Sequence, residues 1–164
     1  MIRSTLTAPR DPEQLRSDVA GMRERIAREH VPASAWDVKY IRGGLVDVEF
    51  IAQYLQLRDA AATSAILNPS TRSALAALAE HDKLARADAE VLLAALRLWQ
   101  TVQGMLRLTL EREPANDEAN LPEALRQALV RATAEADFGR LALHMKETAL
   151  VVRAVYDRLI GDQN

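Results

Sequence analysis

The chain has 164 residues, of which 49% are apolar, and its 21 basic and 23 acidic side chains give a formal net charge of -2. This length fits one compact domain with a buried core, and the interspersed charges argue against nucleic acid as a partner. No apolar run reaches the roughly 18 residues of a membrane-spanning helix, the N-terminus has no signal-peptide pattern, and the absence of cysteine excludes disulfides and thiolate catalysis. The sequence therefore predicts a cytoplasmic protein that contacts no membrane.

The first predicted helix begins after Asp11, which can act as its N-cap, with Pro12 in the first turn and Gln14 placed as in a capping box. It ends before Pro32, and one face is marked by Leu15, Val19, Met22 and Ile26. The basic side chains of this helix alternate with acidic ones, which predicts a solvated charged face rather than a binding site. These basic residues are Arg23, Arg25 and Arg28.

Residues 31–42 lack helical periodicity, and we expect an extended connection there that leads into a turn at Gly43 and Gly44. A second helix begins near Leu45. Its apolar positions recur at helical spacing, at Leu45, Val48, Ile51, Ala52 and Leu55. This spacing places Glu49, Gln53 and Gln56 on a more polar face.

Four further helices are predicted. The third runs from Asn68-Pro69 to His81, and the fourth runs from residue 87 to about residue 112 with Gly104 as a close-packing point. The fourth helix carries a broad apolar stripe, typical of a central helix, at Leu92, Leu96, Trp99, Val102, Leu106 and Leu110. A polar loop at residues 113–120 precedes a fifth helix opened by Pro122 and marked by Leu125 and Leu129. Asp137 caps the last helix, which ends at Gly161 and has a seam at Leu141, Met145, Thr148, Val152, Val155 and Leu159.

The sequence thus predicts an all-α fold, a helical bundle of about five to six helices. A single helical domain spans residues 1–164. It comprises a leading helix and connection at 1–36, a turn and helix at 37–61, and the remaining bundle at 62–164.

The segment DVKYIRGGLVDVEFIAQYLQL at residues 37–57, the signature segment, resembles the sequence that follows the nucleotidyltransferase domain in glutamine synthetase adenylyltransferases. This family is also called glutamate-ammonia-ligase adenylyltransferase. The likeness extends to RDPEQLRSDVAGMRERI at residues 10–26 and, in the signature segment, includes Lys39, Gly43, Gly44, Asp47, Glu49, Phe50, Ile51, Gln53 and Tyr54. The upstream segment and the wording FIAQYLQLR at residues 50–58 are more similar to the C-terminal half of this two-part enzyme. After residue 60 the likeness is one of helical pattern alone.

The resemblance implies AMP transfer from ATP to a tyrosine of glutamine synthetase, with magnesium held by carboxylates, in a bifunctional adenylyltransferase and deadenylylase that regulates nitrogen metabolism. It further implies that the catalytic nucleotidyltransferase domain lies N-terminal to residue 1 and is absent from this sequence. We therefore expect no catalytic residue and no metal ligand in this chain, little transfer activity from the chain alone, and no tight binding of ATP or Mg²⁺ to it. The partners implied are the missing domain, glutamine synthetase and a nitrogen regulatory signalling protein.

Asp47 and Glu49 superficially match the acid pair that holds magnesium in nucleotidyltransferases. That pair lies on a strand, about ten residues after its glycine turn, so that both carboxylates point to one side. Here only Leu45 and Val46 separate Gly44 from Asp47. On a helix, residues two positions apart project about 200 degrees apart, so these two acids do not form a metal-binding pair.

Six residues of the signature segment are the candidate site, namely Lys39, Arg42, Gly43, Gly44, Asp47 and Glu49. In one interpretation the glycine amides, with Lys39 and Arg42, contact a nucleotide phosphate. In the preferred interpretation the glycines turn the chain, while Asp47 and Glu49 favour the helix N-terminus and bind basic groups of an adjoining domain. His81-Asp82 is interpreted as a helix end, because His30 and His144 lie too far away in sequence to complete a metal site. Trp99 is interpreted as a core residue, because it lies in the apolar stripe of its helix.

Two alternatives remain open. The chain could be the helical domain of a uridylyltransferase that acts on the nitrogen regulatory protein, although the wording VEFIAQ at residues 48–53 favours the adenylyltransferase. It could instead be a helical interaction module without enzymatic activity. The sequence leaves open whether this half carries adenylylation or deadenylylation.

Overall fold

The computed structural model describes residues 7–109 and 121–161, and these residues form helices without any strand. The α-helices are α2 (Pro12–Glu29), α3 (Leu45–Asp59), α4 (Thr71–Glu80), α5 (Arg86–Thr109), α6 (Glu123–Thr133) and α7 (Phe138–Leu159), and a 3-10 turn, η1 (Ser64–Ile66), follows α3. The predicted all-α bundle of about five to six helices is confirmed. No helix in the described ranges is long and apolar enough to cross a bilayer.

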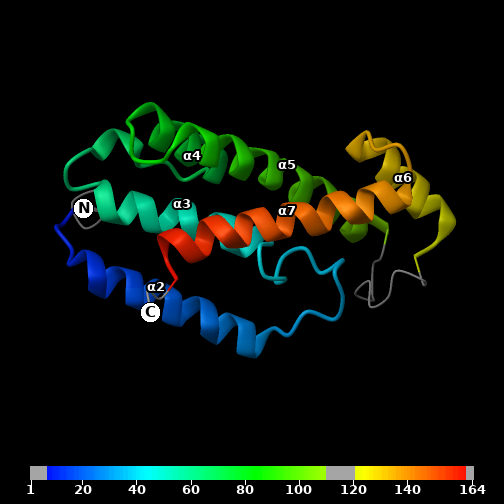
Figure 1. Ribbon diagram of the computed structural model, residues 1–164, viewed down its shortest axis with the longest axis horizontal. Helices are drawn as coiled ribbons and strands as arrows, with labels where there is room; N and C mark the ends of the chain where they lie inside the picture. Colours follow the sequence, from blue (N-terminus) through cyan, green and yellow to red (C-terminus); the bar gives the residue numbers. More distant parts are fainter. Residues whose placement is uncertain (1–6, 110–120, 162–164) are drawn as a thin grey trace.

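Helix α3 lies at the middle of the bundle and packs against α2, α4, α5 and α7. Figure 1 shows α2 along one edge, α4 and α5 along the opposite edge, and α7 crossing the front of the molecule. Helix α5 packs against α3, α4, α6 and α7, so it is a second central element. The predicted stripe explains this position, because Leu92, Leu96, Trp99 and Val102 are fully buried.

The predicted start signals agree with the structure in part. The Asp11 carboxylate accepts a 2.8 Å hydrogen bond from the Gln14 backbone amide, and Asp137 caps Arg140 in the same way at 2.8 Å. The capping box is incomplete, because the Gln14 side chain donates to Asp18 at 2.7 Å instead of reaching back to the cap. Helix α4 begins later than predicted, with Ser70 as its N-cap.

Two predictions on packing are wrong. Met22 is 55% exposed, because α2 turns Arg23 rather than Met22 toward α3. A Cβ atom at Gly104 would meet no atom within 4 Å apart from the nearby backbone of its own helix, so this glycine is not a close-packing point. Leu110 and the predicted loop at residues 113–120 lie outside the described residues.

The connection between α2 and α3 forms compact turns, so the prediction of an extended connection is wrong. The Asp37 amide donates to the Ser34 carbonyl at 3.1 Å, and the Tyr40 amide donates to the Asp37 carbonyl at 3.1 Å. Trp36 is buried and stacks on Phe138, with ring centroids 5.0 Å apart. The indole thus anchors the connection on the bundle near the start of α7.

The predicted polar face of α3 is correct at Gln53, which is exposed, and wrong at Gln56, which is 8% exposed. The Gln56 amide oxygen accepts from the Asn68 backbone amide at 2.7 Å, and its nitrogen donates to the Ala52 carbonyl at 3.3 Å. Gln56 is buried because its side chain accepts a hydrogen bond from a backbone amide of the loop that follows α3. The helical periodicity of α3 does not indicate this partner.

Candidate functional site at the glycine pair

The turn before α3 requires glycine at both positions. Gly43 has a φ of +79 degrees, and a Cβ on it would lie 1.9 Å from the Ala149 carbonyl oxygen of α7. A Cβ on Gly44 would lie 2.4 Å from the Val38 carbonyl oxygen. Since neither contact leaves room for a side chain, Gly43 allows the start of α3 to approach α7 closely, and Gly44 allows it to approach the connection.

The backbone donors of this turn are occupied inside the protein. The Gly43 amide donates to the Asp47 carboxylate, and the Gly44 amide donates to the Ile41 carbonyl at 3.0 Å. The next two amides, of Leu45 and Val46, donate to carbonyls of the connection at 2.8 and 3.1 Å. A nucleotide phosphate would therefore have to displace existing bonds in order to use the helix N-terminus.

The Gly43 carbonyl is the acceptor for the indole nitrogen of Trp99, at 3.1 Å. Trp99 is fully buried on α5, which confirms its interpretation as a core residue. The same turn thus contacts α7 through Ala149 and α5 through Trp99. The glycine pair is a junction of three helices.

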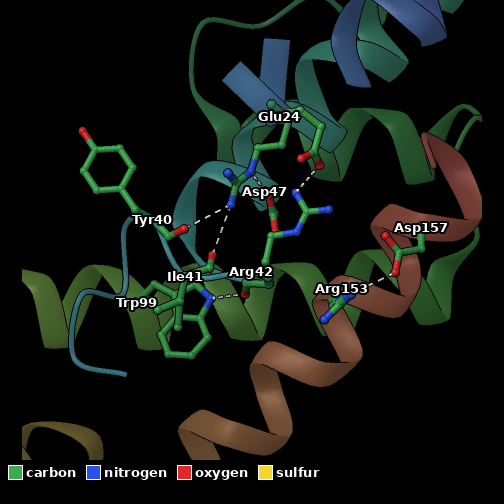
Figure 2. A network of polar contacts seen from close by, with 10 residues as sticks. Glu24, Tyr40, Ile41, Arg42, Asp47, Trp99, Arg153 and Asp157 are labelled. Atoms are coloured by element: carbon green, nitrogen blue, oxygen red, sulfur yellow. Dashed lines mark hydrogen bonds and ion pairs between the residues drawn. The ribbon is translucent and has the colours of Figure 1, made fainter. Parts of the chain in front are cut away.

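The Asp47 carboxylate forms a buried ion pair with Arg23 of α2. The Arg23 side chain is 0% exposed and that of Asp47 is 1% exposed. The Arg23 guanidinium also donates to the carbonyls of Tyr40 at 3.1 Å and Ile41 at 3.4 Å, as Figure 2 shows. The ion pair holds α2 and the connection against the start of α3.

The prediction of a solvated charged face on α2 is wrong for Arg23 and correct for Arg25 and Arg28, which are exposed. Arg23 lies one helical turn after the half-buried Val19, on the side of α2 that packs against α3. That spacing is the one signal that could have indicated burial of this arginine. Its counter-ion, Asp47, is 24 residues away, too far for local periodicity to indicate.

Arg42 immediately precedes the glycine pair in sequence and remains partly accessible. Its side chain is 33% exposed, and its guanidinium lies 3.3 Å from the carboxylate of Glu24 on α2. The guanidinium carbon also lies 5.5 Å from the ring centroid of Tyr156, within the range of a cation-π interaction. Figure 2 shows the contact between Arg42 and Glu24 as a dashed line.

Tyr156 of α7 completes the cluster, although no sequence pattern indicated this residue. Burial raises the pKa of Tyr156 to about 12, and Asp47 acts in the same direction, while Arg42 and Arg23 oppose it. The Tyr156 hydroxyl and the Nη1 atom of Arg23 are buried without a hydrogen-bond partner among the described residues. Such buried atoms usually bind an ordered water, so we expect one at this cluster.

Lys39 and Glu49 lie on the accessible side of the turn, and both are half-buried. The Lys39 amine lies 4.9 Å from the centroid of the Tyr40 ring. Burial raises the pKa of Glu49 above its ordinary value, and the charge of Lys39 partly offsets this effect. These two residues and Arg42 are the candidate side chains that an adjoining domain or a ligand can reach.

Asp47 does not fit a magnesium site. Both Asp47 oxygens are already bonded, one to Arg23 and one to the Gly43 amide, and the side chain is closed to solvent. Elsewhere in the described ranges, no three His, Asp or Glu side chains cluster as metal ligands. His81 is the C-cap of α4, as its interpretation as a helix end predicts. The role of the six candidate residues in nucleotide or domain contact stays a prediction.

Comparison with known proteins identifies a family model and several relatives that match this chain. Residues 13–160 match the family model described as GlnD PII-uridylyltransferase. Proteins named bifunctional glutamine synthetase adenylyltransferase/adenylyl-removing enzyme are 46% identical over 161 residues in Rhodopseudomonas palustris strain BisB5 and 39% identical over 162 residues in Bradyrhizobium sp. strain BTAi1. The alignments cover 98% and 99% of this chain. The chain spans 16% of the length of each of these relatives.

Proposed function

The chain belongs to the glutamine synthetase adenylyltransferase family, and on this premise we propose that it is a helical domain of a larger bifunctional enzyme. In that enzyme it supports AMP transfer from ATP to a tyrosine of glutamine synthetase. The transfer chemistry, with its Mg²⁺ and ATP, belongs to a nucleotidyltransferase domain outside this sequence. We further propose that the enzyme works in the cytoplasm and responds to a nitrogen regulatory signalling protein.

One observation carries this proposal. Asp47, the acid that most resembles a metal ligand, is buried and already paired with Arg23 and the Gly43 amide. A carboxylate in this position stabilises the junction of α2 and α3 and has no free oxygen for a metal ion. This supports a scaffolding role for the signature segment, with the catalytic carboxylates supplied by another domain.

The accessible side of the junction is the proposed contact with that domain. Lys39 and Arg42 offer two cations from the turn, whose backbone bonds are satisfied, and Glu49 offers an anion from the start of α3. Side chains on a rigid turn lose little conformational freedom when they bind, so this surface suits a fixed domain interface. A direct phosphate contact by Lys39 is the competing assignment.

The test uses the complete gene product and measures AMP incorporation into glutamine synthetase for Lys39→Ala and Glu49→Gln. A domain contact predicts a slower transfer, an unchanged KM for ATP, and faster hydrogen exchange across residues 37–49. A phosphate contact predicts for Lys39→Ala a raised KM for ATP with unchanged exchange. Arg28→Ala, at an exposed cation of α2, is the matched control.

Two results would overturn the proposal. The first is AMP transfer by the 164-residue chain alone at a rate comparable to that of the complete protein. The second is kinetics and exchange in the Lys39 and Glu49 variants that match those of the Arg28 control.

A further inference from the structure

A groove of about 500 Å³ lies between the connection and α7, next to the glycine junction. Its walls include Trp36 and Ile41 from the connection and Met145 and Ala149 from α7. Two leucines of α7 that line the groove are unusually open to solvent, Leu143 at 42% and Leu150 at 60% exposed. Exposed leucines beside an apolar groove mark a surface that another apolar group can cover.

The same groove carries positive charge, although the chain as a whole has a net charge of -2. Arg42, Lys146 and Arg153 line it, and no acidic side chain is among its described lining residues. Arg42 pairs with Glu24 at 3.3 Å and Arg153 pairs with Asp157 at 3.5 Å, both at partly exposed positions. Figure 2 shows the second of these pairs on α7. An exposed pair such as Arg153–Asp157 contributes little free energy, so an incoming carboxylate can compete for Arg153.

The spacing along α7 defines the shape of the complementary surface. Leu143 and Leu150 are two helical turns apart, about 10 Å along the axis, and so are Lys146 and Arg153. On a helix the two leucines form one line and the two cations form a second line beside it, about 60 degrees away. The groove therefore presents parallel apolar and cationic rows.

We propose that this groove binds an acidic amphipathic helix, with apolar side chains over Leu143 and Leu150 and carboxylates over Lys146 and Arg153, supplied by the rest of the polypeptide. This proposal rests on the proposed function, since the chain spans 16% of its relatives' length and needs a neighbouring domain. A helix matches rows that repeat every two turns, and grooves of this kind bind amphipathic helices through such apolar anchors.

The geometry disfavours two other occupants. A nucleotide places its phosphates at one point, whereas Lys146 and Arg153 lie about 10 Å apart along the helix. A second copy of the chain, docked groove to groove, would bring two cationic surfaces together, which like-charge repulsion opposes.

The test measures how fast a cysteine at the groove reacts with a maleimide, because this chain has no cysteine of its own. Leu150→Cys is the probe, and Leu108→Cys, at an 82% exposed leucine of α5, is the matched control. Cysteines outside this chain are first replaced by alanine. We expect the groove probe to react at least tenfold more slowly in the complete gene product than in the 164-residue chain, and the control probe to change by less than twofold.

A second arm tests the charge. Adding Lys146→Glu and Arg153→Glu to the probe should return its labelling rate in the complete protein to that of the 164-residue chain, because the carboxylates then meet like charges. Arg140→Glu, at an exposed cation of the same helix, should leave the protection in place. Far-ultraviolet circular dichroism checks that each variant is folded.

The remaining outcomes separate this inference from the proposed function. Equal labelling of the groove probe in both proteins, with slowed hydrogen exchange at residues 37–49 in the complete protein, would overturn the groove assignment and leave the scaffold standing. No protection at either surface would overturn both. Protection of the 164-residue chain by ATP alone, or by raising its own concentration, would assign the groove to a nucleotide or to a second copy and overturn the inference.

Discussion

Removal of one member of the Arg23–Asp47 pair should strongly destabilise the fold. Asp47→Ala leaves the Arg23 guanidinium at 0% exposure without its counter-ion and also leaves the Gly43 amide without its acceptor. Loss of one partner of a buried ion pair costs about 3–5 kcal/mol of unfolding free energy. Arg23→Met should cost a similar amount, since it leaves a buried carboxylate bonded only to Gly43.

The double variant distinguishes pairing from general damage. Arg23→Met with Asp47→Ala leaves no buried charge, so its loss should be about 4–5 kcal/mol and not the roughly 8 kcal/mol sum of the single losses. The coupling free energy in this cycle, the difference between the sum and the double loss, should thus be about 3–4 kcal/mol. Urea unfolding followed by far-ultraviolet circular dichroism gives all four free energies on the 164-residue chain.

The exposed pair of Arg153 and Asp157 on α7 supplies the matched control. Its side chains are 54% and 50% exposed and its charged atoms are 3.5 Å apart, so Asp157→Ala should change the unfolding free energy by less than about 0.5 kcal/mol. Single losses below about 1 kcal/mol at Arg23 and Asp47, or losses that simply add in the double variant, would refute the assigned role of the buried pair.

Three further predictions concern the same junction and use urea unfolding. Gly43→Ala should lower the unfolding free energy by at least about 2 kcal/mol, since the φ of Gly43 is +79 degrees and an added Cβ would lie 1.9 Å from a carbonyl oxygen. Gly104→Ala, in open space on α5, should raise the unfolding free energy by up to about 1 kcal/mol. Equal effects of the two substitutions would contradict the assigned role of Gly43. Trp99→Phe should cost about 1–3 kcal/mol, because the Gly43 carbonyl loses its 3.1 Å donor, and an unchanged stability would contradict that bond. Tyr156 keeps its proton in the folded state up to about pH 12, while the unfolded chain releases it near pH 10, so the unfolding free energy should fall as the pH rises through this interval. Tyr156→Phe should remove this part of the alkaline loss, and identical pH profiles would count against a buried phenol.

The local features of the fold could be predicted because their causes lie within one helical turn. Asp11 and Asp137 bond to amides three residues ahead, and the stripe from Leu92 to Val102 repeats at helical spacing. The errors concern partners that are distant in sequence. Arg23 is buried by Asp47 and Gln56 is buried by Asn68, and a helical pattern assigns polar side chains like these to the solvent.

At the candidate site, too, the local features could be predicted and the partners distant in sequence could not. The sequence indicated correctly that Gly43 and Gly44 form a turn before a helix, since adjacent glycines interrupt the periodicity on either side. It could not indicate that Ala149 of α7 closes on Gly43, because this requires the packing of two helices far apart in the chain. Tyr156 and Arg23 were missed for that reason, although both contribute to the electrostatics of the cluster.

The structure also explains the spacing that made Asp47 resemble a metal ligand. Asp47 lies four residues after Gly43, in the first turn of α3, and this offset places its carboxylate over the Gly43 amide. The same bond orders the connection that carries Lys39 and Arg42. Lys39 and Arg42 belong to the proposed domain contact, and Arg42 also lines the groove, so one buried carboxylate positions both surfaces. Variants of Arg23 or Asp47 should therefore weaken both contacts together with stability, whereas variants of Lys39, Glu49 or Lys146 should affect one contact and leave the unfolding free energy nearly unchanged.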